Sequence, residues 1–290
     1  MVCTWLKAKI IYAWLKAKGS YMTIQYCLNS STIRPASLME KIDIAGQTGY
    51  KAIELWNDDL TAHEERGGSL KDVKQALADH DLCVPTVIAL HGWLGSEGAA
   101  HAEALEEAKC KMEQAVEVGA EFVIASPPMD PFDLARGGAD YRELLEIGKS
   151  IGVRPAMEYL GFMKSVYTIE QAWQIVEDAD YPGSSLIMDP FHILRGGGSI
   201  ESIAKIPADK VAIWHWNDAP GDKPFAEQSD ADRVMPGDGV GPLKEIERLA
   251  LAQGYEGFVS LELFNPVLWE KDPVEVAKIG MEKMQGYFAG

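Results

Sequence analysis

The sequence predicts a single-domain α/β protein with the closed parallel (β/α)₈ barrel, or TIM-barrel, fold. Strand-like apolar runs alternate with helix-like segments from Met22 onward, and eight such pairs can be traced. The chain has 290 residues, which leaves a length close to the roughly 250 residues typical of this fold once the first 21 are set aside. No G-x-G-x-x-G motif opens the first pair, which disfavours the alternative of an open, doubly wound sheet.

The first four pairs each combine a short apolar run with a segment whose apolar residues have helical spacing. Gly49, Gly119 and Gly152 fall just past three of the helical segments, where a left-handed residue commonly ends a helix. The expected strands are residues 23–28, 52–56, 83–90 and 122–125, and the expected helices are 37–48, 70–80, 99–118 and 139–151.

The second half repeats the alternation, with Gly254 after its third helix. The expected strands are residues 155–159, 186–189, 211–216 and 259–263, and the expected helices are 168–179, 200–204, 242–253 and 273–287. A long loop, residues 219–241, follows the seventh strand. It lies on the face where TIM barrels carry their active sites, so we expect a functional rim or lid.

The composition is that of an acidic globular protein. Lys and Arg number 27 against 44 Asp and Glu, and the net charge of −17 would repel nucleic acid phosphates and anionic membranes. The four cysteines include no C-x-x-C pair, which favours reduced thiols over disulfides or structural zinc. No apolar run is long enough to span a bilayer. We expect a cytoplasmic protein that binds neither nucleic acid nor membrane and that could form a homo-oligomer.

The first 21 residues differ from the rest. The sequence Trp-Leu-Lys-Ala-Lys occurs twice, at residues 5–9 and 14–18, and no acidic residue precedes Glu40. Such a basic start could be a targeting or membrane-surface helix. We favour an N-terminal basic extension outside the fold, with the catalytic domain spanning residues 22–290.

Four polar residues follow apolar runs on the last four expected strands: Glu158, Asp189, His215 and Glu262. The carboxyl ends of barrel strands meet on one face, so these side chains should converge there. A lone buried charge is costly unless it is paired or bound to metal. Three carboxylates and one imidazole suit a divalent cation such as Mn²⁺, Mg²⁺, Co²⁺ or Zn²⁺. The alternative is that each carboxylate pairs with Arg or Lys at the rim.

Further residues near the same face are candidates for substrate contacts. His192 and Arg233 could hydrogen-bond substrate oxygens, and Glu54 could hold either the second nitrogen of His215 or the substrate. The alternatives are a packed histidine, a surface ion pair and a buried acid paired elsewhere. An aromatic pocket wall for a polyhydroxylated ring would comprise His91, Trp93 and Trp216, although these residues could equally be core.

Five motifs together resemble the xylose isomerase-like TIM barrels, the sugar phosphate isomerase/epimerase family, nearest to its inosose (2-keto-myo-inositol) isomerase branch. The resemblance covers about residues 22–290. The motifs are Ala-Met-Glu158-Tyr-Leu-Gly, Met-Asp189-Pro-Phe-His192, His215-Trp-Asn-Asp218, Asp232-Arg233-Val-Met-Pro-Gly-Asp-Gly239 and Ser-Leu-Glu262-Leu-Phe-Asn-Pro266.

This resemblance implies one bound divalent metal ion, with Mn²⁺ favoured, and the four ligands named above. It also implies that Glu158 and Glu262 serve as base and acid on a small polyhydroxylated keto substrate, through an enediolate that the metal stabilises. The expected activity is isomerisation or epimerisation of a keto-sugar or keto-cyclitol. The alternatives are a dehydratase acting on an inosose or a dehydroshikimate-like substrate, and a barrel that binds sugar without turnover. The related apurinic-site endonucleases are disfavoured, because Arg233 stands where their pattern has a histidine.

Overall fold

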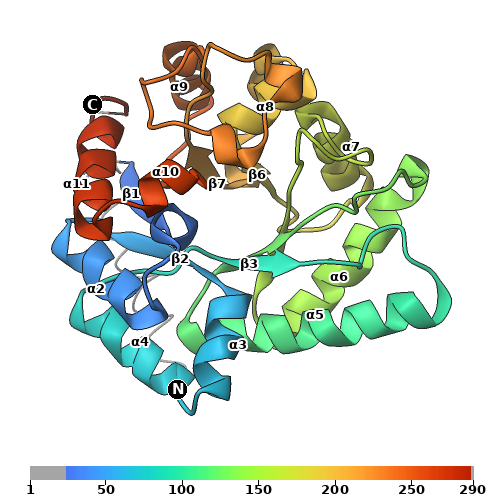
Figure 1. The fold of residues 1–290 in the computed structure, drawn as a ribbon. Helices are drawn as coiled ribbons and strands as arrows, with labels where there is room; N and C mark the ends of the chain where they lie inside the picture. The colour runs from blue at the N-terminus through green and yellow to red at the C-terminus, as the bar shows by residue number, and fades with distance from the viewer. Residues whose placement is uncertain (1–23, 289–290) are drawn as a thin grey trace, which may run out of the picture.

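Eight parallel strands form a closed barrel in sequence order, with the helices around it (Figure 1). This computed structural model describes residues 24–288, so the expected extension at residues 1–21 lies outside the described residues. The strands are β1 Gln25–Asn29, β2 Ala52–Trp56, β3 Thr86–Leu90, β4 Phe122–Ala125, β5 Arg154–Met157, β6 Leu186–Met188, β7 Val211–Trp216 and β8 Phe258–Leu261. The predicted TIM-barrel fold and the single barrel domain are confirmed.

Seven of the eight predicted helices are present, with ends shifted by a few residues. They are α2 Leu38–Gln47, α4 Leu70–Asp79, α5 Gly98–Val118, α6 Gly137–Ile151, α7 Ile169–Asp178, α9 Leu243–Ala252 and α11 Pro273–Met284. Ser37 and Thr168 cap α2 and α7, each in a reciprocal box with a side chain three residues later. None of the helices among residues 24–288 is both long and apolar enough to cross a membrane.

The structure corrects the prediction after β6. The expected helix 200–204 is a 3₁₀ helix, η3 Ile200–Lys205, and α8 Pro190–Gly196 precedes it. The Asp189 side chain accepts hydrogen bonds from the backbone of Phe191 and His192, and Pro190 occupies the first helical turn, which together start α8 immediately after the strand. The sequence prediction also lacked α3 Asn57–Glu65, α10 Pro266–Trp269 and the 3₁₀ helices η1 Ser30–Ile33, η2 Leu134–Arg136, η4 Ala208–Lys210, η5 Phe225–Glu227 and η6 Asp230–Asp232.

Side chains alternate between the inside and the outside of the barrel along each strand. Inward-facing apolar residues, among them Phe122, Ala156, Ile187 and Ile213, pack together in a small core inside the barrel. The intervening residues, such as Trp214 of β7, belong to the larger core between the strands and the helices. Polar residues therefore form the next inward layer, two residues further along several strands, at the carboxyl end of the barrel.

Candidate metal centre

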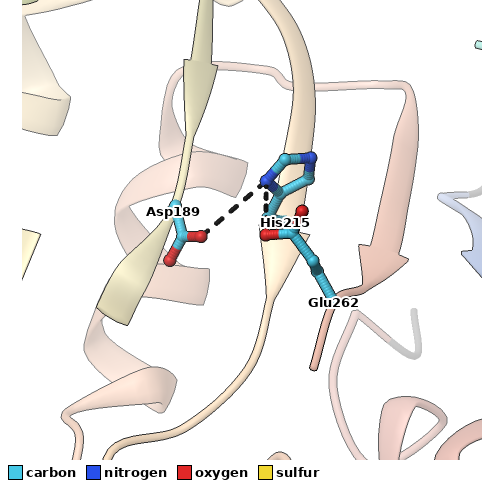
Figure 2. Close-up of side chains that lie close together, drawn as sticks. All are labelled: Asp189, His215 and Glu262. Atoms are coloured by element: carbon cyan, nitrogen blue, oxygen red, sulfur yellow. Dashed lines mark ion pairs between the residues drawn. The ribbon is translucent and has the colours of Figure 1, made fainter. Parts of the chain in front are cut away.

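Three side chains converge at the carboxyl ends of β6, β7 and β8. Asp189, His215 and Glu262 each offer one ligand atom, and these atoms lie within 4.8 Å of one another (Figure 2). Each residue follows an inward-facing apolar or small residue by two positions, so the strand period aims all three at the barrel axis. The side chains are at least nine-tenths buried. The sequence prediction placed these three residues together, and the structure does the same.

The imidazole of His215 is held with one nitrogen aimed at the two carboxylates. Its Nε2 atom lies 3.2 Å from Glu54 Oε1, and its Nδ1 atom lies 2.9 Å from Glu262 Oε2 and 3.7 Å from Asp189 Oδ2. The buried Nδ1 atom is within ion-pair distance of both carboxylates (Figure 2) but makes no hydrogen bond. A ring nitrogen that shares a buried space with two carboxylate oxygens is a donor set for a divalent cation, so these residues fit a metal ion.

Glu54 and its neighbours fix this orientation. Burial would raise the pKa of the Glu54 carboxyl, but His215 and the hydroxyls of Ser260 and Thr86 lower it below its usual value. Glu54 Oε2 accepts hydrogen bonds from Ser260 Oγ at 2.6 Å and from Asn29 Nδ2 at 2.9 Å. Of the two roles considered for Glu54, the geometry matches the contact with the second nitrogen of His215.

Replacing Glu54 with glutamine should weaken cation binding by about 10- to 100-fold, the usual cost of losing a carboxylate behind a ligating histidine. The amide is nearly isosteric, but it is uncharged and can present its NH₂ group to the imidazole. Competition of the purified variant with a chelating dye would measure the change. Glu121→Gln, on the exposed side chain that precedes β4, is the control. Equal affinity in the Glu54 variant and the wild type would contradict this role.

Glu158, the fourth predicted ligand, lies outside the cluster of three. It follows β5 and is 8% exposed, and its Oε2 atom accepts a hydrogen bond from Ser126 Oγ at 2.7 Å. Burial raises the pKa of the Glu158 carboxyl to about 8, and the Glu262 and Asp189 carboxylates add to the rise, while His215 and Ser126 oppose it. Glu158 therefore faces the same centre, and its role as a ligand stays a prediction.

Cation affinity should depend on pH through Glu158. Below about pH 8 its carboxyl carries a proton, which a cation binding as a carboxylate ligand must displace. Apparent affinity should therefore fall by about tenfold or more per unit as the pH drops below that value. Dye competition across neutral pH would measure how the logarithm of the apparent affinity changes with pH. In Glu158→Gln this slope should be smaller by about one log unit per pH unit. The same slope in both proteins would contradict the proton linkage.

Arg233 and His192 lie beside the cluster, and Arg233 is buried rather than a surface residue; their substrate contacts stay a prediction. It is 1% exposed, and its Nη1 atom donates to Glu262 Oε2 at 2.6 Å and to Asp189 Oδ2 at 3.0 Å. Its Nη2 atom lies 2.8 Å from His192 Nε2. The guanidinium packs between the rings of Phe191 and Phe264, 4.9 and 5.3 Å from their centroids. Both residues are therefore buried beside the carboxylates of the cluster.

For the two tryptophans of the predicted aromatic pocket wall, the structure matches the alternative, that they belong to the core. Trp216 and Trp93 are completely buried in the core between the barrel and the helices, and the Trp216 ring packs 5.5 Å from Tyr287. Trp216 follows the inward-facing His215 by one position, so its side chain must point outward. His91 is exposed after β3, and partial desolvation and the charge of Lys111 lower the pKa of its imidazole. None of these three side chains forms a hydrogen bond or an ion pair with the side chains of Asp189, His215 or Glu262 in the described part of the chain.

Several polar residues at the centre were missed by the sequence analysis. Asn29 donates to Glu54 and to Glu262, each at 2.9 Å, and Asn217 donates to both oxygens of Asp189 at 3.2 Å. Asn29 ends β1 after an apolar run, the same signal that identified the ligands. That signal was applied only to charged residues and histidine, which is why the amides were overlooked.

The fold and the site together define a class of protein: a closed β/α barrel with a centre of carboxylates and histidine at the carboxyl ends of its strands. The chain belongs to the xylose isomerase-like TIM barrel family, whose model matches residues 42–287. The inosose isomerase of Halalkalibacterium halodurans is 27% identical over 88% of this chain and 93% of that relative. The 3-dehydroshikimate dehydratase of Pseudomonas aeruginosa is 30% identical over 79% of this chain but only 36% of its own length.

Solved structures with the same fold support this family relationship. The IOLI protein, crystallised with a bound zinc atom, superposes with a TM-score of 0.86 at 26% identity, over 92% of this chain and 100% of that chain. D-psicose 3-epimerase superposes with a TM-score of 0.74 at 18% identity, over 92% of this chain and 100% of that chain, a similarity that concerns the fold alone. The predicted relationship to this family, with inosose isomerases among the relatives, is confirmed.

Proposed function

We propose that this protein is a divalent-metal-dependent isomerase or epimerase of a keto-sugar or keto-cyclitol of the inosose type. The observation that carries the proposal is the buried His215 Nδ1 atom facing the Asp189 and Glu262 carboxylates, with Glu54 holding the opposite ring nitrogen. The inosose isomerase relatives, matched over nearly their full length, support the same enzyme class.

Asp189, His215 and Glu262, joined by Glu158, would hold the ion. A bound divalent cation polarises a carbonyl and stabilises negative charge that develops on its oxygen. The zinc of the IOLI structure and the mixed oxygen and nitrogen donors support a divalent ion, and we propose Mn²⁺ as the working metal.

The side chains around the centre would transfer the proton and position the substrate. Glu262, which forms an ion pair with Arg233, is the candidate base for a proton next to the carbonyl. Glu158, whose buried carboxyl has a raised pKa, is the candidate acid that returns the proton to the substrate. Arg233 and His192 would hydrogen-bond substrate oxygens. Return of the proton to the same carbon gives epimerisation, and return to the neighbouring carbon gives isomerisation.

The second candidate function is dehydration of a cyclic keto substrate. The observation that favours it is the 30% identity to a 3-dehydroshikimate dehydratase, although the match spans about a third of that protein. Both reactions begin with removal of a proton beside a carbonyl. They differ in whether a hydroxyl then leaves, which would give an absorbing enone.

Solvent exchange tests the proposal. The Mn²⁺-loaded protein, incubated in D₂O with 2-keto-myo-inositol, should incorporate deuterium at the carbon beside the carbonyl, which NMR would detect. The same sample should develop no enone absorbance if isomerisation is the reaction. Absence of deuterium with that substrate and with a panel of ketoses would refute the proposed function.

The proposal includes a cytoplasmic location, which the free thiols of Cys27, Cys83 and Cys110 favour.

A further inference from the structure

Asn29 stands between two of the carboxylates at the carboxyl end of the barrel. It is the last residue of β1, which pairs with β2 on one side and with β8 on the other. Its partner across the first pair is Glu54, and Glu262 follows the last residue of β8. The Asn29 side chain is completely buried, so its amide must find its hydrogen-bond partners within the protein.

The amide of Asn29 is held in one orientation. Its Oδ1 atom accepts hydrogen bonds from the Ser31 backbone N–H at 3.0 Å and from the Trp56 ring N–H at 3.2 Å. Both of these groups can only donate, so the oxygen must face them and the NH₂ group must face the other way. There the Nδ2 atom donates to Glu54 Oε2 and to Glu262 Oε1, each at 2.9 Å. The two donors and the two acceptor positions of the amide are therefore all used.

These contacts close a ring of four side chains that includes His215. Glu54 Oε1 lies 3.2 Å from the Nε2 atom of the imidazole, and Glu262 Oε2 lies 2.9 Å from its Nδ1 atom. Asn29 joins the other oxygen of each carboxylate. The positions of both carboxylates relative to the imidazole therefore depend on one amide.

A neutral donor suits this place for an electrostatic reason. The Glu54 and Glu262 carboxylates both lie 2.9 Å from the same nitrogen, and like charges this close repel each other. The amide hydrogens offset that repulsion without adding a positive charge, which would compete with a cation. An aspartate of the same shape would instead add a third negative charge, and while ionised it could donate to neither carboxylate.

We propose that Asn29 is a positioning residue of the candidate metal centre, which fixes Glu262 with Oε2 turned toward the cluster and holds Glu54 against His215. The inference rests on the proposed function where it concerns the reaction, and it adds a residue of β1 that acts through the two carboxylates. With Oε1 turned toward β1, Oε2 is the oxygen of Glu262 that faces the other ligands of the cluster. Asn29 should therefore affect both the affinity for the cation and the rate of proton transfer.

Two substitutions separate this role from a merely structural one. Asn29→Ala removes both donors, and Asn29→Asp keeps the shape and the acceptor oxygen but cannot donate while it is ionised. Each should lower kcat for deuterium exchange into 2-keto-myo-inositol by about 10²-fold, the usual cost of a shift of about 1 Å in a reacting group, with a smaller change in KM. Asn29→Ala should also weaken Mn²⁺ binding by about tenfold, which competition with a chelating dye would measure without substrate.

Asn57→Ala is the matched control. Asn57 is 1% exposed and follows β2, and its Nδ2 atom donates to the Lys111 carbonyl at 3.2 Å and to Gln114 Oε1 at 3.1 Å, both on α5. The substitution removes two hydrogen bonds of a buried amide that faces a helix rather than the cluster. It should lower the midpoint of thermal unfolding, as Asn29→Ala should, but leave the Mn²⁺ affinity and kcat unchanged.

Wild-type exchange rates in both Asn29 variants would overturn this inference, and so would a folded Asn29→Ala protein that binds Mn²⁺ as tightly as the wild type. Losses of the same size in Asn57→Ala would also overturn it, because they would show a general effect of destabilisation. A wild-type protein that binds Mn²⁺ but incorporates no deuterium into any ketose or inosose would refute the proposed function instead. The Mn²⁺ affinity of Asn29→Ala would then decide the role of Asn29 by itself.

Discussion

Glu262→Gln should lower deuterium incorporation into the keto substrate by about 10²- to 10⁴-fold, the range expected for loss of a positioned base. The carboxylate is held from both ends: Asn29 donates to Oε1 at 2.9 Å, and Arg233 donates to Oε2 at 2.6 Å. Glutamine keeps the shape but cannot take up a proton. Because its amide is nearly isosteric, the fold should be retained.

The test of Glu262→Gln requires the exchange rate of the variant and a check that the variant is folded. NMR-detected exchange in D₂O at saturating Mn²⁺ gives the rate, and circular dichroism with thermal unfolding checks the fold. Glu256→Gln, at an exposed residue just before the same strand, is the matched control and should behave like the wild type. A folded, metal-loaded Glu262→Gln protein with undiminished exchange would remove Glu262 from the proposed mechanism.

The convergence of the cluster could be predicted because it depends only on topology. Eight alternating strand and helix segments imply a closed barrel. Every second residue of a strand points inward, so an inward-facing residue at the end of a strand lies close to the barrel axis. The same parity, had it been applied to β7, would have excluded Trp216 from the pocket, since adjacent residues of a strand point to opposite faces. This error came from using strand ends without the period of two.

The long loop after β7 was harder to predict because its geometry depends on contacts distant in sequence. The acidic sequence around Arg233 is typical of an exposed ion pair, yet the residue is buried against Asp189 and Glu262. Nothing local in the sequence encodes that burial. It depends on where the loop is tied back to the barrel, and that tie is the carboxylate of Asp218.

Asp218→Ala should be among the most damaging substitutions in the protein. The buried Asp218 carboxylate accepts four backbone N–H groups, from Ala219, Gly237, Gly239 and Gly241, at 2.8 to 3.1 Å. Any Cβ atom at residue 239 or 241 would lie within 2.7 Å of this carboxylate, which explains the glycines there. Leaving these donors unpaired should destabilise the fold by about 3 kcal/mol or more.

The activity should fall further than stability alone requires, because Asp218 also places Arg233. The backbones of Asp218 and Val234 exchange two hydrogen bonds of 3.0 Å, so the loop that the carboxylate organises returns to the barrel one residue after Arg233. A shift of about 1 Å in a substrate-positioning group costs about 10²-fold in rate. Exchange in D₂O, measured below the unfolding temperature, should show that loss. The midpoint of thermal unfolding should also fall by roughly 6 °C or more.

Asp222→Ala, in the exposed part of the same loop, is the control and should change neither the exchange rate nor the unfolding midpoint. An Asp218→Ala protein that behaved like this control would show that the four hydrogen bonds do not hold the loop.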